Sequence, residues 1–251
     1  MKKNDPLTQT LLTLTLLCGA LTAAMALVSS LIANDIALPT DGGVGLDAGT
    51  INDEITVVID AGHGGEDGGT QSAEGMYEKD INLEIARILD TMLRANGVQT
   101  VMTRTEDILL YDRNVDYHGR KKVLDLAARK RIAEENENAI FVSIHMNSFP
   151  EEKYRGLQVF YSPNNPTSEK LAARIQDMTW EYLQQQNDRK IKKATSSIYL
   201  LDRLQCPAVL VECGFLSNPE EAALLAQSDY RRELAFVLFS AVMSYISSQN
   251  A

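Results

Sequence analysis

The sequence predicts an α/β fold: a single domain over residues 55–251 with a mainly parallel central sheet of about six strands flanked by helices, preceded by an N-terminal membrane segment. From residue 55 onward, short β-branched runs alternate with longer segments of helical apolar spacing, which is typical of parallel strands joined by crossover helices. The chain has 251 residues, 45% hydrophobic and 23% charged, which suits one globular domain of ordinary size plus an extension.

The first half of this domain begins with a strand at residues 55–60 (Ile-Thr-Val-Val-Ile-Asp), which ends in the glycine-rich turn 61–65. Apolar residues then recur at helical spacing over 79–95, and Asn96-Gly97 ends that helix. The elements expected next are a strand at 98–103, a helix at 123–136 and a strand at 139–144.

The second half predicts further strands at 157–161, 197–201 and 207–212 and helices at 167–187, 219–226 and 229–247. Trp180 stands amid helical spacing, so we expect it in the core and not on a sugar-binding surface. Cys206 and Cys213 are an odd number of positions apart on one apparent strand, so they should point to opposite faces and remain buried, unlinked thiols.

The N-terminus predicts a membrane-targeting segment over residues 1–33, either a signal-anchor or a cleaved signal peptide. Lys2 and Lys3 precede the uncharged stretch 7–33, which is long enough to cross a bilayer and favours a retained anchor. Ala24-Met25-Ala26 offers a cleavage site, so both interpretations stay open. The lysines belong on the cytoplasmic side, which places the domain outside the cytoplasm, beyond a glycine-containing linker at 34–54.

The charge balance bears on partners. Acidic residues outnumber basic ones by 34 to 24, and the formal charge of -10 argues against a nucleic-acid-binding surface.

Four residues carry the chemistry: His63, Glu78, His145 and Glu212, each where a predicted element begins or ends. Two histidines and a carboxylate are a common ligand set for catalytic zinc, and a second carboxylate can take a proton from water. The carboxyl ends of the strands meet at one edge of such a sheet, which favours a shared site there. Taken singly, each residue also has a structural explanation, and Glu212, at the end of a buried strand, is the strongest candidate.

Competing motifs are absent. The turn Gly62-His63-Gly64-Gly65 does not continue into Gly-x-Gly-x-x-Gly, and the chain contains neither Gly-x-Ser-x-Gly nor His-Glu-x-x-His. The zinc set must therefore be assembled from distant segments.

Four segments, in order, resemble the motifs of the zinc-dependent N-acetylmuramoyl-L-alanine amidases: Val58 to Gly65, Glu78 to Leu83, Ser143 to Ser148 and Val211 to Asn218. The resemblance implies that His63, Glu78 and His145 hold Zn²⁺ and that Glu212 is the catalytic carboxylate. It also implies hydrolysis of the amide between N-acetylmuramic acid and L-alanine, and no organic cofactor. The implied substrate, peptidoglycan, lies outside the membrane, in agreement with an enzyme at the cell membrane or secreted to the cell wall.

The chain departs from the family pattern between Arg104 and Arg129, where an additional segment (105–128) contains a basic stretch at 117–122. In this it is similar to the Firmicute germination-specific amidases, which act in forming muramic lactam in the spore cortex. The basic stretch suits either stem-peptide carboxylates or a solvated loop. Alternatives to the amidase are an inactive peptidoglycan- or partner-binding protein and a zinc glycan deacetylase, and an activator protein is left open.

Overall fold

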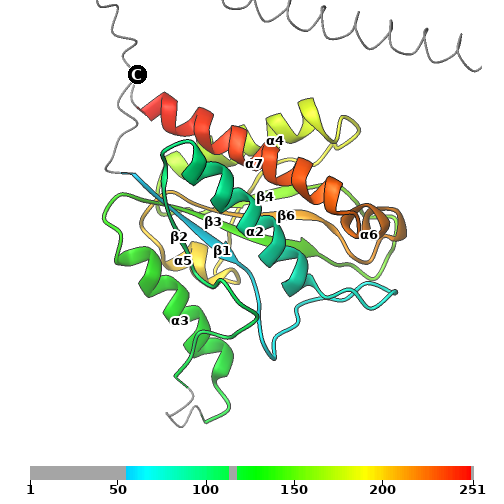
Figure 1. The fold of residues 1–251 in the computed structure, drawn as a ribbon, viewed down its shortest axis with the longest axis horizontal. Coiled ribbons are helices and arrows are strands. Elements are labelled where there is room, and N and C mark those ends of the chain that lie inside the picture. Colours follow the sequence, from blue (N-terminus) through cyan, green and yellow to red (C-terminus); the bar gives the residue numbers. More distant parts are fainter. Residues whose placement is uncertain (1–54, 113–117, 250–251) are drawn as a thin grey trace, which may run out of the picture. The chain divides into compact units, whose positions relative to one another are not determined.

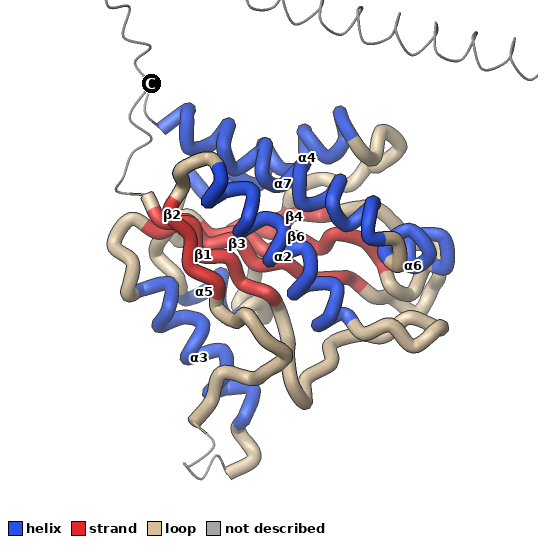
Figure 2. Tube along the Cα trace, in the orientation of Figure 1, coloured by secondary structure: helices blue, strands red, loops and turns tan. Residues whose placement is uncertain are grey.

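The computed structural model describes residues 55–112 and 118–249, which form a six-stranded sheet covered by helices (Figures 1 and 2). The elements in chain order are β1 (Thr56–Ala61), α2 (Glu78–Ala95), β2 (Gln99–Met102), α3 (Lys121–Glu134), β3 (Ala139–Asn147), β4 (Gln158–Tyr161), α4 (Thr167–Tyr182), β5 (Lys192–Lys193), α5 (Tyr199–Arg203), β6 (Ala208–Phe215), α6 (Pro219–Leu225) and α7 (Ser228–Gln249).

The sheet is mainly parallel, as predicted, with the strand order β2-β1-β3-β6-β4-β5. Strands β2, β1, β3 and β6 run parallel to one another, β4 pairs antiparallel with β6, and β5 pairs parallel with β4. Because the central strands run in one direction, their carboxyl ends meet at one edge of the sheet.

Helices cover both faces of the sheet (Figure 2). On one face, α2, α4 and α7 bury side chains such as Leu89, Ile175 and Leu238 against the sheet. On the other face, α3 and α5 pack against Val58 and Phe141. Burying each large aliphatic side chain contributes about 1.5–3 kcal/mol, so these two clusters hold the sheet edge in place.

The strand predicted at 197–201 is wrong, because this segment forms the short helix α5. The sixth strand is instead β5, a two-residue edge strand at Lys192–Lys193. Leu200 and Leu201 of this helix are both buried, in the cluster that also contains Val58 and Phe141. A short apolar run cannot distinguish these two structures.

Two other predictions on α4 require correction. The helix ends at Tyr182, not at 187, since the backbone N–H groups of Leu183 and Gln184 both bond to Thr179 O. Trp180 is not in the core: its side chain is 54% exposed, because α4 buries Leu171, Ile175 and Thr179 instead.

The predicted pattern of cysteines is confirmed only in part. Both thiols are free, Cys213 is buried, and Cys206 is half-buried just before β6.

The predictions for residues 1–54 lie outside the described residues. Within the described part of the chain, no helix is both long and apolar enough to cross a membrane.

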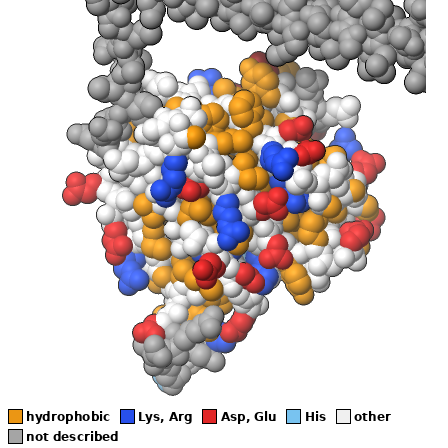
Figure 3. Space-filling view, viewed as in Figure 1, with side chains coloured by type: hydrophobic (Ala, Val, Ile, Leu, Met, Phe, Trp, Pro, Cys, Tyr) orange, Lys and Arg blue, Asp and Glu red, His pale blue; other side chains and the backbone are white. Residues whose placement is uncertain are grey.

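The outer helical layer exposes apolar groups among its charged side chains (Figure 3). Phe236 of α7 is 58% exposed and, with Met92 and Tyr182, lines a groove between α2, α4 and α7.

Candidate metal centre

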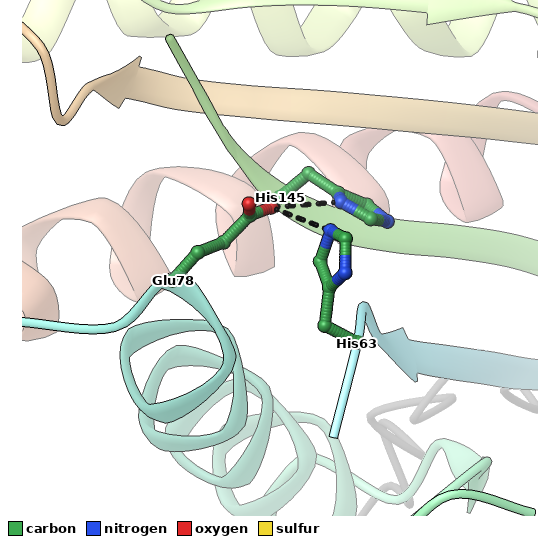
Figure 4. Close-up of side chains that lie close together, drawn as sticks. All are labelled: His63, Glu78 and His145. Atoms are coloured by element: carbon green, nitrogen blue, oxygen red, sulfur yellow. Dashed lines mark hydrogen bonds and ion pairs between the residues drawn. The ribbon is translucent and has the colours of Figure 1, made fainter. Parts of the chain in front are cut away.

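Three of the four predicted residues converge at the carboxyl edge of the sheet (Figure 4). His63 lies in the turn after β1, Glu78 is the first residue of α2, and His145 lies within β3. One potential ligand atom from each lies within 4.8 Å of the others, which makes this the candidate metal cluster among the described residues. Residues separated by more than eighty positions thus share one site.

Glu78 is the centre of this cluster. Its Oε1 lies 2.9 Å from Nδ1 of His145 and 3.3 Å from Nε2 of His63, and the side chain is buried. Backbone N–H groups of Met146 and Thr70 donate to its two oxygens. Burial raises the pKa of this carboxyl, but the two histidines lower it more, and the net pKa lies well below its usual range. Glu78 is therefore an anion facing two imidazoles.

His63 adopts an unusual backbone conformation, with φ of 62°. A non-glycine residue there costs on the order of 1–3 kcal/mol, so the surroundings must hold it. Nη2 of Arg129 donates to His63 O at 2.7 Å, and Oδ1 of Asp67 lies 2.9 Å from Nδ1 of the imidazole. The ring is thereby turned so that Nε2 faces Glu78.

The charge of His63 follows from these neighbours. Burial lowers the pKa of the imidazole, but Asp67 and Glu78 outweigh it, and the pKa is raised to about 9. An imidazole binds a metal in its neutral form, so protonation of His63 competes with metal binding.

Glycines in the turn after β1 leave room for the site. A Cβ on Gly62 would stand 2.2 Å from Nε2 of His145, inside the space of its ring. A Cβ on Gly69, where φ is +68°, would stand 2.4 Å from Oε2 of Glu78. The glycine-rich sequence is needed here because two of the clustered side chains lie against its backbone.

Glu212 lies beside the cluster. It is the register partner of His145 across the parallel pair β3 and β6. Its Oε2 is buried and has no hydrogen-bond partner among the described residues. Burial, with a smaller contribution from Glu78, raises the pKa of Glu212 to about 7 against the opposing effect of the two histidines. A carboxyl with this pKa can accept and return a proton near neutral pH.

A buried ionic network fixes the turn that carries His63. Asp60, at the end of β1, accepts hydrogen bonds from Arg129, Thr103 and Ser143 at 2.7, 2.8 and 2.6 Å. Arg129 also donates to Asp125 and to Ala61 O. These charges satisfy one another and position the backbone of the turn.

A second arginine completes the support. Arg104 donates to Ala61 O, Gly62 O and Lys79 O, which joins the turn to the start of α2. Sequence reasoning missed these supporting roles, as well as that of Asp67. One signal in the sequence could have indicated the role of Asp60. Like Glu212, it is a charged residue that follows an apolar, buried strand segment.

The additional segment (105–128) contacts acidic residues that follow the glycine-rich turn after β1. Lys121 pairs with Glu66 at 2.6 Å, and Lys122 lies 3.5 Å from Asp67. Lys121 and Lys122 are therefore directed at acidic side chains of the chain itself. His118 does not belong to the metal cluster found among the described residues.

The donor set suits zinc. Two imidazoles and one carboxylate match a catalytic zinc site with three protein ligands, and the buried, unpartnered oxygen of Glu212 lies next to them. The residues present therefore fit such an ion.

Comparison with known proteins agrees with this site. A family model described as N-acetylmuramoyl-L-alanine amidase matches residues 57–243. The germination-specific N-acetylmuramoyl-L-alanine amidase of Bacillus subtilis is 34% identical over 193 residues, covering 77% of this chain and 80% of that protein.

Solved structures show the same relationship. The CwlD amidase from Clostridioides difficile, solved in complex with the GerS lipoprotein, has 36% identity and a TM-score of 0.72, covering 77% of this chain and 98% of that one. An N-acetylmuramoyl-L-alanine amidase from Clostridium difficile 630 has 31% identity and a TM-score of 0.68 over 78% and 98% of the two chains. The chain therefore belongs to the N-acetylmuramoyl-L-alanine amidases and is a hydrolase that acts on peptidoglycan.

Proposed function

We propose that this amidase uses zinc held by His63, Glu78 and His145, with Glu212 as the catalytic carboxylate. The observation that carries the proposal is the convergence of the three ligand atoms within 4.8 Å beside the unpartnered Oε2 of Glu212. The bond cleaved is the amide between N-acetylmuramic acid and the L-alanine of the stem peptide.

A zinc ion held there would supply a Lewis acid for the amide carbonyl and make water more acidic. Glu212 accepts the proton of the attacking water and delivers it to the leaving alanine nitrogen, as its raised pKa of about 7 suits. Asp67 and Arg129 keep the His63 side chain and backbone in place while Glu78 holds its position through backbone N–H groups. Each residue thus has a role that its contacts support.

The test is Glu212→Gln, which keeps the shape of the side chain and removes its basicity. We expect the purified variant to contain about one zinc per chain, as the wild type does, and to release stem peptide at least about 100-fold more slowly. His145→Ala is the matched control, because it should lose the metal as well as the activity. Wild-type hydrolysis by Glu212→Gln would remove Glu212 from the mechanism.

Mass spectrometry of the products separates the alternatives. An amidase releases stem peptide, whereas a glycan deacetylase releases acetate. A metal-replete wild type that releases neither product would support a binding protein.

The location of the enzyme is part of the proposal. Residues 1–33 act as a signal-anchor that keeps the catalytic domain outside the cytoplasm, or as a signal peptide that leads to secretion to the cell wall. Lys2 and Lys3 ahead of an uncharged stretch support this orientation. Protease added to intact cells from which the wall has been removed should digest the domain if it is anchored outside.

We also propose a role in forming spore-cortex muramic lactam, which the similarity to a germination-specific amidase supports. The complex of the CwlD amidase with a lipoprotein supports a lipoprotein partner for this chain, and we propose that such a partner activates it. Deletion of the gene should abolish muramic lactam in the cortex, and added lipoprotein should raise the rate of the purified enzyme. Unchanged cortex composition would count against the sporulation role.

A further inference from the structure

A groove of about 750 Å³ is lined by the second half of α4 and by the segment that leads to β5. We call it the Trp180 groove. Its lining includes Gln176, Trp180, Gln185, Gln186, Asn187 and Lys190. Its volume is within the range of pockets that hold small ligands.

The Trp180 groove is linked to β6, the strand that carries Glu212, through Gln158 of β4. Gln158 is the register partner of Glu212 across β4 and β6. Its side chain donates to Lys190 O at 2.8 Å and accepts from Arg189 at 3.1 Å. The segment from 189 to 190 therefore forms both a wall of the groove and a contact to β4, about two strand spacings, ~10 Å, from the strand that carries Glu212.

The walls of the groove are held by buried hydrogen bonds. Gln176 and Asn187 both donate to Leu157 O, at 3.0 and 2.8 Å. Gln176 also accepts from the backbone N–H of Val159. The groove walls are thus hydrogen-bonded to the backbone on both sides of Gln158, at Leu157 and Val159. The groove is therefore formed before a ligand binds.

The chemistry of the lining favours a sugar. Trp180 is 54% exposed and presents a large apolar ring beside several amide side chains. The apolar face of a pyranose packs on such a ring, while amides donate to and accept from hydroxyl and N-acetyl groups. Three carboxylates and two cations of the lining (Asp177, Glu181, Asp188, Arg189 and Lys190) nearly cancel, which suits a neutral sugar better than a stem peptide with several carboxylates.

We propose that the Trp180 groove binds an N-acetylated sugar of the glycan strand, adjacent to the residue whose amide is cut. The substrate of the enzyme is a polymer, so its neighbouring sugars extend beyond the reacting bond. This inference rests on the proposed function, because it places the reacting bond at Glu212. It makes Trp180 a determinant of the preference for glycan strands.

The chain itself provides the probe, because Trp180 is its only tryptophan. The ligand is a β-1,4-linked tetramer of N-acetylglucosamine, which has neither a lactyl group nor a stem peptide. It is titrated into the full-length chain carrying Glu212→Gln. We expect a saturable blue shift of the tryptophan emission. Emission that stays unchanged up to millimolar tetramer, or that responds only to free stem peptide, overturns the proposal.

Kinetics give the second readout. Trp180→Ala should raise KM on strands of several disaccharides about five- to tenfold with little change in kcat, and Trp180→Phe should restore most of the affinity. Tyr182→Ala is the matched control, since Tyr182 is 64% exposed on the same helix but lines other grooves. An equal effect of Tyr182→Ala, or no effect of Trp180→Ala, would contradict the proposal. Circular dichroism checks that each variant folds.

The two proposals fail separately. Fluorescence reports on the groove whether or not Glu212 is the base. Conversely, hydrolysis by Glu212→Gln would overturn the catalytic role of Glu212. It would not change the result of the fluorescence titration, which tests only sugar binding in the groove.

Discussion

The glycine at position 62 allows a direct test of how closely the site is packed. In Gly62→Ala, the added Cβ would stand 2.2 Å from Nε2 and 2.3 Å from Cε1 of His145. Ordinary contact begins at 3.4 Å, so the His145 ring must move by the difference, about 1.2 Å. A displacement of about 1 Å in a catalytic group can lower the rate on the order of 100-fold, which corresponds to about 2.7 kcal/mol.

We therefore expect Gly62→Ala to lower kcat/KM for stem-peptide release about 100-fold and to weaken zinc binding. Zinc affinity is measured by competition with a chromophoric chelator, and the melting temperature shows whether the fold persists. Gly214→Ala is the matched control, because its nearest neighbour, Oε2 of Glu221, lies 3.4 Å from the added Cβ. Wild-type zinc affinity and activity in Gly62→Ala would refute the argument that His145 occupies this space in the working enzyme.

Three other predictions concern the residues that support the site. Asp67→Asn should weaken zinc affinity about 10- to 100-fold, because the carboxylate that orients His63 is lost; an unchanged affinity in the chelator assay would contradict this. Arg129→Met leaves the buried Asp60 carboxylate without its cation and should destabilise the fold by about 3–5 kcal/mol in urea unfolding. Burial raises the pKa of Asp60, but Arg129 and the hydrogen bond from Ser143 lower it more, so the folded pKa lies below the ordinary 3.8. The stability from Asp60 is therefore present above about pH 4 and lost as the pH falls through the lowered folded pKa. Asp60→Asn should make urea unfolding less dependent on pH in this window, and an unaltered dependence would exclude Asp60 as its source.

Local patterns in the sequence were sufficient for most of the fold. Strand β1 and helix α2 agree with their predicted ranges to within a residue or so, because β-branched runs and helical apolar spacing report on burial. The two wrong predictions, the strand at 197–201 and the buried Trp180, both depend on information that a short local pattern does not contain. The run that forms α5 is too short to show its period, and the exposure of Trp180 depends on which face of α4 meets the sheet.

The site was predictable as a set of residues but not as a geometry. His63, Glu78, His145 and Glu212 were named from their positions at the ends of apolar runs and from their motifs. The strands β3 and β6 in fact continue past His145 and Glu212, which lie side by side in register. That pairing, and the position of Asp67 against His63, arise from contacts between distant segments.

The sequence by itself determined the class of fold, the four chemical groups and the family, because periodicity and motifs are local properties of the chain. Only the tertiary structure decided which groups touch. It brought Glu78 between two imidazoles, placed the Glu212 oxygen in a buried position without a partner, and joined Asp60 to Arg129 beneath the turn. It also turned Trp180 outward into a groove lined by α4 and the segment before β5. The physical reason is that charge, burial and pKa depend on neighbours in space, and the order of residues along the chain does not specify those neighbours.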